Sequence, residues 1–443
     1  MTAIILCLAA FLVTCLAARR SLVHGLIAVL ATGYCYGILR ANVINSASHF
    51  IFDASLGGLY FVQLWAKQTP EGVKRSATLR AWVATLIGWP IFVCFLPFQT
   101  LMVTLVGLRG NIFFLPLCLF GPRMKSHDWH SLSVAVAALN LTALSFGLAE
   151  YFLGLERFYP VSAVTAIIYA SRDVAGFQFY RIPATFTNAH SYAGTMVFTL
   201  PLLIGAWARP AISLVRRFFL LSGIAAAAVG VLLANARIHV VAAAVIALSA
   251  LLFGNLSARK RAVWCAALVA VGLLALSNDR FQRFLSLGDA DAVAERISGS
   301  VNRTFLEILT EYPMGNGLGG GGTSIPSFLE GQVVKPVQME SEYARILLEQ
   351  GVIGLLIWIC FVIQFLRSTK FGLGEWAEAR RLTWVACATF FATAMIGTGL
   401  LTSIPQTALM ILGLGWVMTP PEDTRPFSMM DHSFPVEYEA EPV

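Results

Sequence analysis

Apolar residues fill long stretches of the chain, and short links that carry most of the charged residues separate them. A helix that spans a membrane needs about 20 mainly apolar residues. Thirteen stretches approach or reach this length, at residues 2–18, 21–39, 50–66, 81–97, 100–120, 131–153, 190–208, 217–234, 238–253, 262–277, 346–366, 382–400 and 403–418. The pattern predicts an all-α fold, a polytopic transmembrane helix bundle of about 12–13 spans.

Lys and Arg residues are concentrated in alternate links, which indicates the orientation of the bundle. The basic links are Arg19-Arg20 and residues 67–80, 121–130, 209–216, 254–261 and 367–381, whereas the short links between them hold almost no Lys or Arg. Basic links stay in the cytoplasm. The alternation holds along the whole chain, so it supports the number of spans better than any single stretch does.

Two links are long, 154–189 and 278–345, and both fall on the outer side. The predicted organisation is therefore a first unit of spans over 1–277, a large outer loop with short helices over 278–345, and the last spans over 346–418. The tail, 419–443, is rich in Pro and acidic residues. Such a composition predicts a disordered segment, which the alternation places in the cytoplasm.

Composition excludes several classes of protein. Hydrophobic residues make up 57% of the 443 residues and charged residues 12%, about half the charged share of a soluble domain. The net charge of +7 lies in the links, so it reflects membrane topology and not nucleic-acid binding. The eight cysteines fall inside apolar stretches and lack metal-ligand spacing, so neither a disulfide framework nor a zinc site is expected.

Arg237 is the first candidate for chemistry. The apolar stretch from Phe218 to Phe253 is short for two spans, so the turn containing Arg237 is expected to lie below the outer membrane surface. An arginine at that depth is costly and marks a functional site. The alternative is an interfacial arginine that snorkels to lipid phosphate. His239 follows two residues later.

The segment from Arg181 to Asn188, followed by His190, leads from an outer link into a span. A guanidinium binds phosphate oxygens through a bidentate fork, and a helix start favours anions. Ordinary helix capping would explain Asn188 alone. Arg109 lies in the middle of the 100–120 stretch, and it either binds substrate or pairs with a carboxylate. Asp53, at the outer end of another stretch, belongs to the same cavity or caps its helix.

The large loop contributes a third group of candidates. Arg303 precedes a glycine-rich run that includes Gly317 and Gly319, where the backbone could approach a ligand closely or serve as a hinge. Glu340, Glu342 and Tyr343 stand at the start of the next span. A carboxylate there could act as a general base for a hydroxyl, or could be an acidic cap of the helix.

In this order the features resemble the superfamily of bacterial O-antigen ligases and O-antigen polymerases, which has many spans and a large periplasmic loop late in the chain. The matching features are Arg181 to Asn188, Ala236-Arg237, Arg303, Pro313 to Gly317, Tyr343 and Glu349 to Gly354. Each motif is weak alone, and their order and topology together are more specific.

The resemblance implies a multi-pass glycosyltransferase of the bacterial inner membrane. It would polymerise undecaprenyl-pyrophosphate-linked repeat units of an exopolysaccharide, capsule or O-antigen at the periplasmic face. Membrane lipid and other polysaccharide-assembly proteins are its potential partners. The residues expected at the pyrophosphate are Arg181, Arg237, Arg303, Arg109, Asn188 and His190, and those expected at the glycan are Tyr343, Gly317 and Gly319. Arginines would supply the positive charge, so no metal or other cofactor is expected.

One departure bears on the reaction. The family's ligases carry a histidine where this chain has Glu340, and no histidine occurs between residues 240 and 431. A polymerase with Glu340 as the base therefore fits better than a ligase that joins glycan to lipid A core. Glu342 is expected to pair with Arg345 at i,i+3, and His190 and His239 are the next candidates for the base. A transporter is the alternative from another class, but the chain shows no internal repeat.

Overall fold

The computed structural model describes residues 1–67, 69–170, 180–209, 212–254, 258–277, 294, 298, 305–322, 325–337, 339, 341–369, 371–372, 374–397 and 399–421. Helices dominate this part of the chain, and it contains no β-strand. The α-helices are α1 (Thr2–Arg20), α2 (Leu22–Asn42), α3 (Ile51–Leu64), α4 (Pro70–Arg75), α5 (Ala77–Cys94), α6 (Leu101–Ile112), α7 (Ser126–Leu153), α8 (Ala166–Ala170), α9 (Ala189–Ala208), α10 (Leu214–Leu233), α11 (Arg237–Phe253), α12 (Ala258–Ser277), α14 (Glu307–Glu311), α15 (Glu342–Leu366), α16 (Ala377–Thr393) and α17 (Gln406–Met418). The predicted all-α class is confirmed.

Each of the thirteen predicted stretches contains a helix. In the described part of the chain, eight helical segments are long and apolar enough to cross a membrane: α1, α2, α5, α7, α9, α10, α15 and Leu101–Arg123, which joins α6 to two 3-10 turns. The chain is therefore a multi-pass membrane protein. Two further apolar helices, α11 and α17, have 17 and 13 residues.

The predicted stretch 382–400 is helical only as far as Thr393. The helix ends there because the backbone carbonyl groups that follow bond to another helix. The carbonyl oxygens of Ala394 and Gly397 accept hydrogen bonds from the backbone N–H of Glu342, at 2.8 and 3.1 Å. The chain after α16 thus forms a turn that satisfies the first residue of α15, and the next helix begins only at Gln406.

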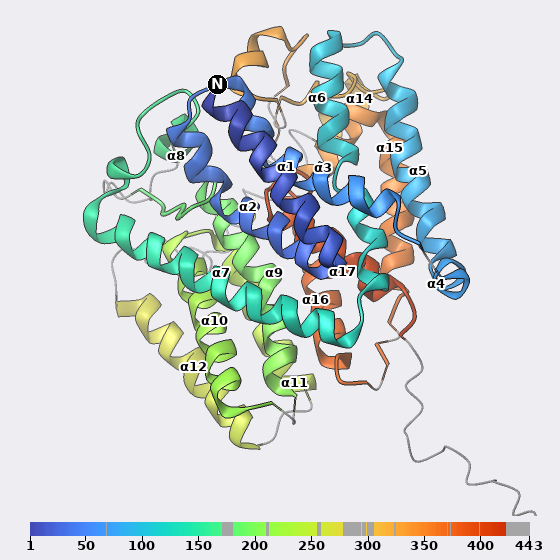
Figure 1. Ribbon diagram of the computed structural model, residues 1–443. Coiled ribbons are helices and arrows are strands. Elements are labelled where there is room, and N and C mark those ends of the chain that lie inside the picture. The colour runs from blue at the N-terminus through green and yellow to red at the C-terminus, as the bar shows by residue number, and fades with distance from the viewer. Residues whose placement is uncertain are drawn as a thin grey trace, which may run out of the picture.

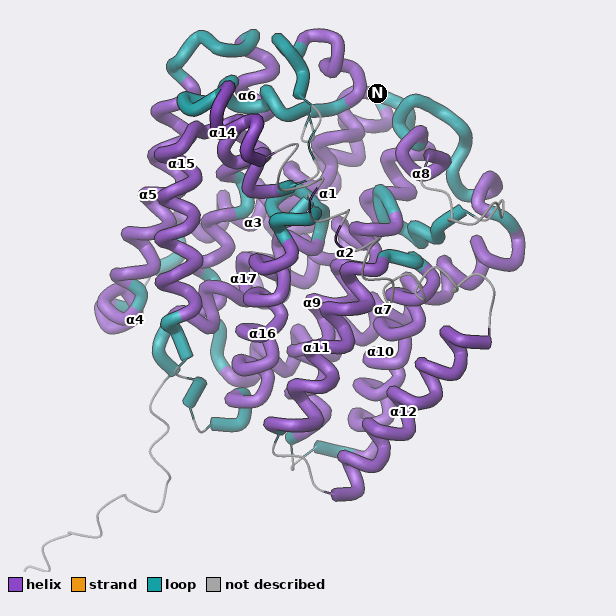
Figure 2. The backbone as a smooth tube through the Cα atoms, turned by 180° about the vertical axis from the view of Figure 1, so that it is seen from behind, coloured by secondary structure: helices purple, strands orange, loops and turns teal. Residues whose placement is uncertain are grey.

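Helix α9 forms the centre of the bundle and contacts α7, α10, α11, α16 and α17. Almost all of its residues are buried. Small residues allow this close packing, as is usual between membrane helices. A Cβ atom at Gly205 would lie 2.3 Å from the Cβ of Ala379 on α16. Figures 1 and 2 show the surrounding helices on either side of α9.

The described parts of the two long links emerge at one end of the bundle. Helix α8 belongs to the link 154–189 and α14 to the link 278–345, and both lie at the end that also holds the N-terminus (Figures 1 and 2). Helix α4, from the basic link 67–80, lies away from that end. The two long links therefore lie on one side of the bundle, as the alternation of basic links predicts.

Candidate functional site

The segment 181–186 enters the bundle without helical structure and is buried. Non-helical backbone at membrane depth is tolerated only where protein covers it or a cavity accepts it. Here neighbouring elements supply the hydrogen bonds. The N–H of Ile182 donates to the Leu233 carbonyl at 3.3 Å, and the Ile38 N–H donates to the Thr185 carbonyl at 3.1 Å. The buried Tyr159 hydroxyl lies 2.6 Å from the Ala184 oxygen.

Glu150, near the end of α7, contacts this segment through a hydrogen bond. The sequence argument did not single out Glu150. Its side chain is 1% exposed, and its Oε2 atom accepts a hydrogen bond from the Ala184 N–H at 3.0 Å. Ala184 has a φ of +50°, a conformation that costs energy for a residue with a side chain. The contact therefore fixes a strained backbone three residues after Arg181. The sequence signal that could have identified Glu150 was a carboxylate inside a predicted span.

Two of the residues expected at the pyrophosphate lie in contact. The Arg181 guanidinium donates to Nε2 of His190 at 3.0 Å, and the rings of His190 and His239 are 5.8 Å apart. His239 is 6% exposed, and its Nδ1 atom has no hydrogen-bond partner. The structure thus brings the first residue of the entry segment, the start of α9 and the start of α11 to one place.

Arg237 is the first residue of α11, two residues before His239. Within the described part of the chain its guanidinium forms no hydrogen bond or ion pair, and its buried Nε has no partner. The preceding Asn235 is fully buried with a φ of +49°, so the turn that presents Arg237 is tightly constrained. We call Arg181, His190 and His239, together with Arg237, which is included for its place two residues before His239 on α11, the cationic cluster.

Asn188 caps α9, which is the alternative to ligand binding that the sequence left open for this residue. Its side chain accepts a hydrogen bond from the Ser191 N–H at 2.8 Å and caps α9. Gly194, on the next turn of α9, faces the cationic cluster. A Cβ atom at Gly194 would lie 2.9 Å from Nε2 of His239 and 1.7 Å from Oε1 of Gln406 on α17. A side chain larger than hydrogen at Gly194 is incompatible with this geometry.

A second polar cluster lies at the start of α15, and all three of its charged side chains are fully buried. Arg345 Nη2 is 2.6 Å from Glu342 Oε1, as the i,i+3 expectation predicted, and Arg345 Nη1 is 2.8 Å from Glu349 Oε2. Asn111 on α6 donates to the same Glu349 oxygen at 2.7 Å. Oε1 of Glu349 has no hydrogen-bond partner.

Gly351 breaks α15 directly after this cluster, with φ +70° and ψ −178°. The interrupted backbone bonds are replaced from other elements. The Val352 N–H donates to the Pro313 oxygen at 3.0 Å, and Trp89 Nε1 donates to the Gln350 oxygen at 3.0 Å. The glycine-rich turn therefore packs against the break within α15, where the sequence had left a hinge as the alternative.

Gly317 and Gly319, predicted at the glycan, both have a φ of +82° and are buried. The backbone of Gly319 lies so close to α6 that a Cβ atom on Gly107 would be 2.2 Å from the Gly319 N atom. These glycines fix the shape of the turn against α6. The Tyr343 hydroxyl donates to the Phe391 carbonyl at 2.9 Å, which holds α15 to α16.

The end of α16 lies between the two clusters. Glu342 Oε2 accepts a hydrogen bond from the Gly399 N–H at 2.7 Å, so this segment contacts the carboxylate cluster. On its other side, the Phe390 ring packs against the ring of His239 at 5.6 Å. A Cβ atom on Gly397 would be 3.6 Å from the side chain of Ile238. Phe390, Gly397 and Gly399 thus lie between the cationic cluster and the carboxylates of α15.

Arg109 belongs to neither cluster. Its Nε and Nη2 atoms donate to the two oxygens of Asp53, each at 2.8 Å. Of the two roles left open for Arg109, pairing with a carboxylate is the one observed. The nearby His49 lies in a 3-10 turn before α3, and its burial, with Arg40 and Arg109 close by, lowers its pKa to about 4. Arg303 and Glu340 lie outside the described residues.

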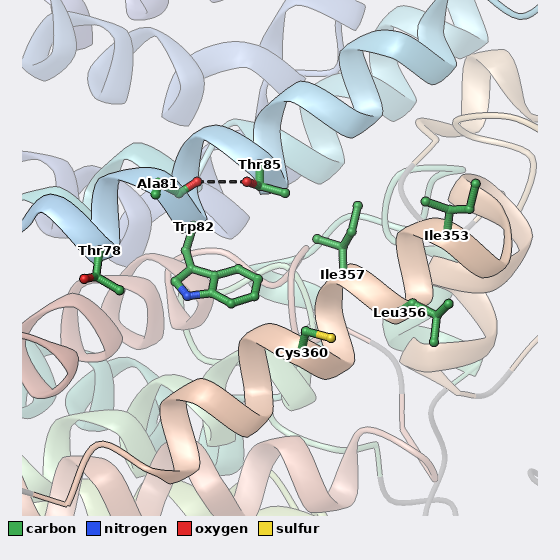
Figure 3. Close-up of a pocket in the computed structure, with 8 residues that line it drawn as sticks. All are labelled: Thr78, Ala81, Trp82, Thr85, Ile353, Leu356, Ile357 and Cys360. Carbon is green, nitrogen blue, oxygen red and sulfur yellow. Dashed lines mark hydrogen bonds between the residues drawn. The ribbon is translucent and has the colours of Figure 1, made fainter.

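A shallow apolar groove of about 450 Å³ runs between α5 and α15 (Figure 3). Its lining consists of Thr78, Ala81, Trp82, Thr85, Ile353, Leu356, Ile357 and Cys360. The Thr85 hydroxyl donates to the Ala81 carbonyl at 2.9 Å, so this lining threonine presents mainly its methyl group. The groove starts just beyond the break at Gly351, and its surface suits a hydrocarbon chain.

Comparison with known proteins adds no assignment, since no protein-family model and no curated protein matches the chain. Within the described residues, no group of three or more His, Cys, Asp and Glu side chains is placed to hold a metal ion.

Proposed function

We propose that this protein is a membrane glycosyltransferase that polymerises oligosaccharide units carried on a lipid pyrophosphate, at the membrane face where α8 and α14 lie. The observation that carries the proposal is the cationic cluster. Placing an arginine within a membrane helix bundle without an anionic partner is unfavourable, and the half-buried Arg237 has no such partner within the described residues. A pyrophosphate would provide the missing negative charge.

The reaction follows from this placement. The oxygen of an acceptor sugar hydroxyl forms a bond to the anomeric carbon of the donor sugar. The bond between that carbon and the pyrophosphate oxygen breaks, and the lipid pyrophosphate leaves with the electron pair. Arg237 and Arg181 stabilise the developing negative charge, which is how preorganised donors lower a barrier. The acceptor proton passes to a general base, for which Glu340 remains the proposed residue.

The apolar groove between α5 and α15 supports a lipid-linked substrate in a general way, because it offers a hydrocarbon chain a surface inside the membrane. A ligase would use the same donor and the same cationic cluster. The two activities differ only in the acceptor, which is a second lipid-linked glycan for a polymerase and lipid A core for a ligase. Supplying each acceptor separately to the purified protein distinguishes them.

A transporter has one feature in its favour, since broken helices line the binding sites of many transporters and α15 is broken at Gly351. At this break, however, Pro313 and Trp89 provide partners for the backbone groups of Val352 and Gln350. These groups are therefore not available to coordinate an ion, and the enzyme proposal remains the better supported one.

Arg237 provides the decisive experiment. Arg237→Ala should reduce the rate of glycan polymerisation by about 100- to 1000-fold, the usual effect of removing a preorganised donor. Arg237→Lys should be nearly as defective, because lysine keeps the charge but lacks the planar fork. Chain length of the glycan, separated by gel electrophoresis, reports the effect.

The matched control is Arg157→Ala, which removes an exposed arginine from the link that contains α8 and should leave chain length unchanged. Protein amount in the membrane must be equal in all variants. Normal chain length from Arg237→Ala would refute the proposed role and would leave Arg237 as an interfacial arginine.

A further inference from the structure

A polar hollow of about 460 Å³ lies where three basic links meet. The start of α7, which contributes to the lining, lies away from α8 and α14 (Figure 1). The lining of the hollow comes from Lys125, Ser126, His127, His130, Arg209 and Glu375. These residues belong to the links 121–130, 209–216 and 367–381 and to the first turn of α7. All three links are predicted to face the cytoplasm. The hollow is separate from both clusters described above.

Arg209 is held in position before any ligand arrives. Its guanidinium forms an ion pair with Glu375 and stacks 4.9 Å above the ring of Trp376. Ser126 completes the arrangement, since its hydroxyl is bonded to Glu375 at 3.1 Å and accepts from Trp376 Nε1 at 2.9 Å. Cation–π and ion-pair contacts together restrict the side chain. A guanidinium held in this way loses little freedom when an anion binds.

His130 presents a donor that has no acceptor. The Arg216 guanidinium is bonded to Nε2 of His130. A guanidinium can only donate, so Nε2 must accept and the ring proton must be on Nδ1. The Nδ1 atom is buried and has no hydrogen-bond partner. A buried N–H group without an acceptor is unfavourable, so the His130 ring that lines the hollow has an unsatisfied donor.

The charges around the hollow favour an anion. The basic side chains at or next to the hollow are those of Lys125, Arg209 and Arg216, which contacts His130, and the acidic ones are those of Asp128 and Glu375. Asp128 Oδ2 accepts a hydrogen bond from the Lys125 backbone N–H at 2.9 Å, and Oδ1 lies 3.2 Å from His127. Glu375 is already bonded to Arg209 and is 58% exposed. Both acids are therefore engaged, and at least one positive charge remains uncompensated.

We propose that this hollow binds the phosphate of an anionic phospholipid headgroup in the cytoplasmic leaflet. Basic pockets between membrane helices on that side bind such headgroups. The start of α10, next to Arg216, supplies the apolar surface for the acyl chains. Leu214 and Val215 there are 66% and 82% exposed. A site for soluble phosphate alone would not need this apolar flank.

The test uses the full-length protein purified in an uncharged detergent. Melting temperature is measured with phosphatidylglycerol, phosphatidylcholine or inorganic phosphate added at equal concentrations. Phosphatidylglycerol should raise the melting temperature in a concentration-dependent way, as expected for a ligand of the folded state. Phosphatidylcholine and inorganic phosphate should have little effect. Native mass spectrometry should show the anionic lipid retained on the protein.

Lys125→Gln with Arg216→Gln is the informative variant, because Lys125 and Arg216 are exposed and neither forms the Arg209 pair. Its apparent affinity for phosphatidylglycerol should fall at least tenfold. The control, Arg367→Gln, removes an exposed arginine outside the hollow and should bind as the wild type does.

Three results would overturn the proposal. Phosphatidylcholine could stabilise the wild-type protein as well as phosphatidylglycerol does, which would leave only a hydrocarbon effect. Inorganic phosphate could match the lipid, which would exclude the lipid as the source of the phosphate. The double variant could bind the lipid with unchanged affinity. The wild-type comparison is decisive even if the variant is unstable. None of these results depends on glycosyltransferase activity.

Discussion

Arg345→Met is the sharpest test of the interactions that hold the start of α15. Methionine keeps most of the length and apolar stem of arginine but removes the charge and all donors. Glu342 and Glu349 are then both buried without their common partner, since all three side chains are 0% exposed. Glu342 retains the Gly399 N–H, and Glu349 retains Asn111. These remaining donors are neutral and only partly compensate two carboxylates.

Removing one partner of a buried ion pair costs about 3–5 kcal/mol of folding free energy. That loss corresponds to a decrease of roughly 100- to 4000-fold in the ratio of folded to unfolded protein, at 1.4 kcal/mol per tenfold change. Neutralising the carboxylates as well, in Arg345→Met with Glu342→Gln and Glu349→Gln, should recover much of the loss. Amides keep the hydrogen bonds to Gly399 and Asn111 but carry no buried charge.

The assay is thermal unfolding of the purified protein in detergent, followed by loss of the monodisperse peak in gel filtration. Arg367→Met is the control, because a surface change of this kind typically alters stability by less than about 0.5 kcal/mol. The expected order of melting temperatures is wild type and control, then the triple variant, then Arg345→Met. If Arg345→Met melts with the control, or if the triple variant is no better than the single one, the buried ion pairs do not stabilise the fold.

Three further predictions concern the segment after Arg181 and the proposed general base. Glu150→Gln should keep near-normal polymerisation because its amide oxygen still accepts from the Ala184 N–H, whereas Glu150→Ala should reduce both polymerisation and melting temperature; equal behaviour of the two variants would contradict the positioning role. Gly37→Ala should prevent folding, because its Cβ would lie 1.9 Å from the Phe186 carbonyl carbon, while Gly57→Ala, with nothing within 4 Å, should be silent in the same expression and gel-filtration measurement. Glu340→Gln should abolish polymerisation at normal protein levels; glycan of full length from this variant would mean that the base is another residue.

The fold class could be predicted because a membrane-spanning helix needs only a long apolar run, and such runs are visible in the sequence. The same rule failed at 382–400, where apolar residues after Thr393 serve as a turn. Hydropathy does not record where a carbonyl oxygen is needed, and here Ala394 and Gly397 accept from the start of α15. Helix ends that depend on contacts distant in sequence are therefore not predictable from composition.

The site was predicted only in part, for a similar reason. Arg181, His190 and Arg237 stood out because charged residues are rare near spans, and the structure places Arg181 against His190. Glu150 and Glu349 were equally unusual by that criterion. Their partners, the Ala184 N–H and Asn111, are 34 and 238 residues away. The available signal for Glu349 was its spacing of four residues from Arg345, which places both on one helix face.

The structure changes the argument about the general base. Glu340 was preferred as the base because of its position in the family's motif and because Glu342 was expected to pair with Arg345 on one helix. Helix α15 begins at Glu342, with Ser341 as its N-cap, so helical geometry says nothing about Glu340. Glu342 itself is excluded on other grounds, since Arg345 binds one of its oxygens and the Gly399 N–H binds the other. A base must have an oxygen or nitrogen free to take the acceptor proton.

His239 meets that condition through Nδ1 and lies in the cationic cluster, so it is the residue to test if Glu340→Gln remains active. In that case both His239→Gln and His239→Asn should stop polymerisation. Activity in either variant would mean that the protein chiefly assists the departure of the pyrophosphate.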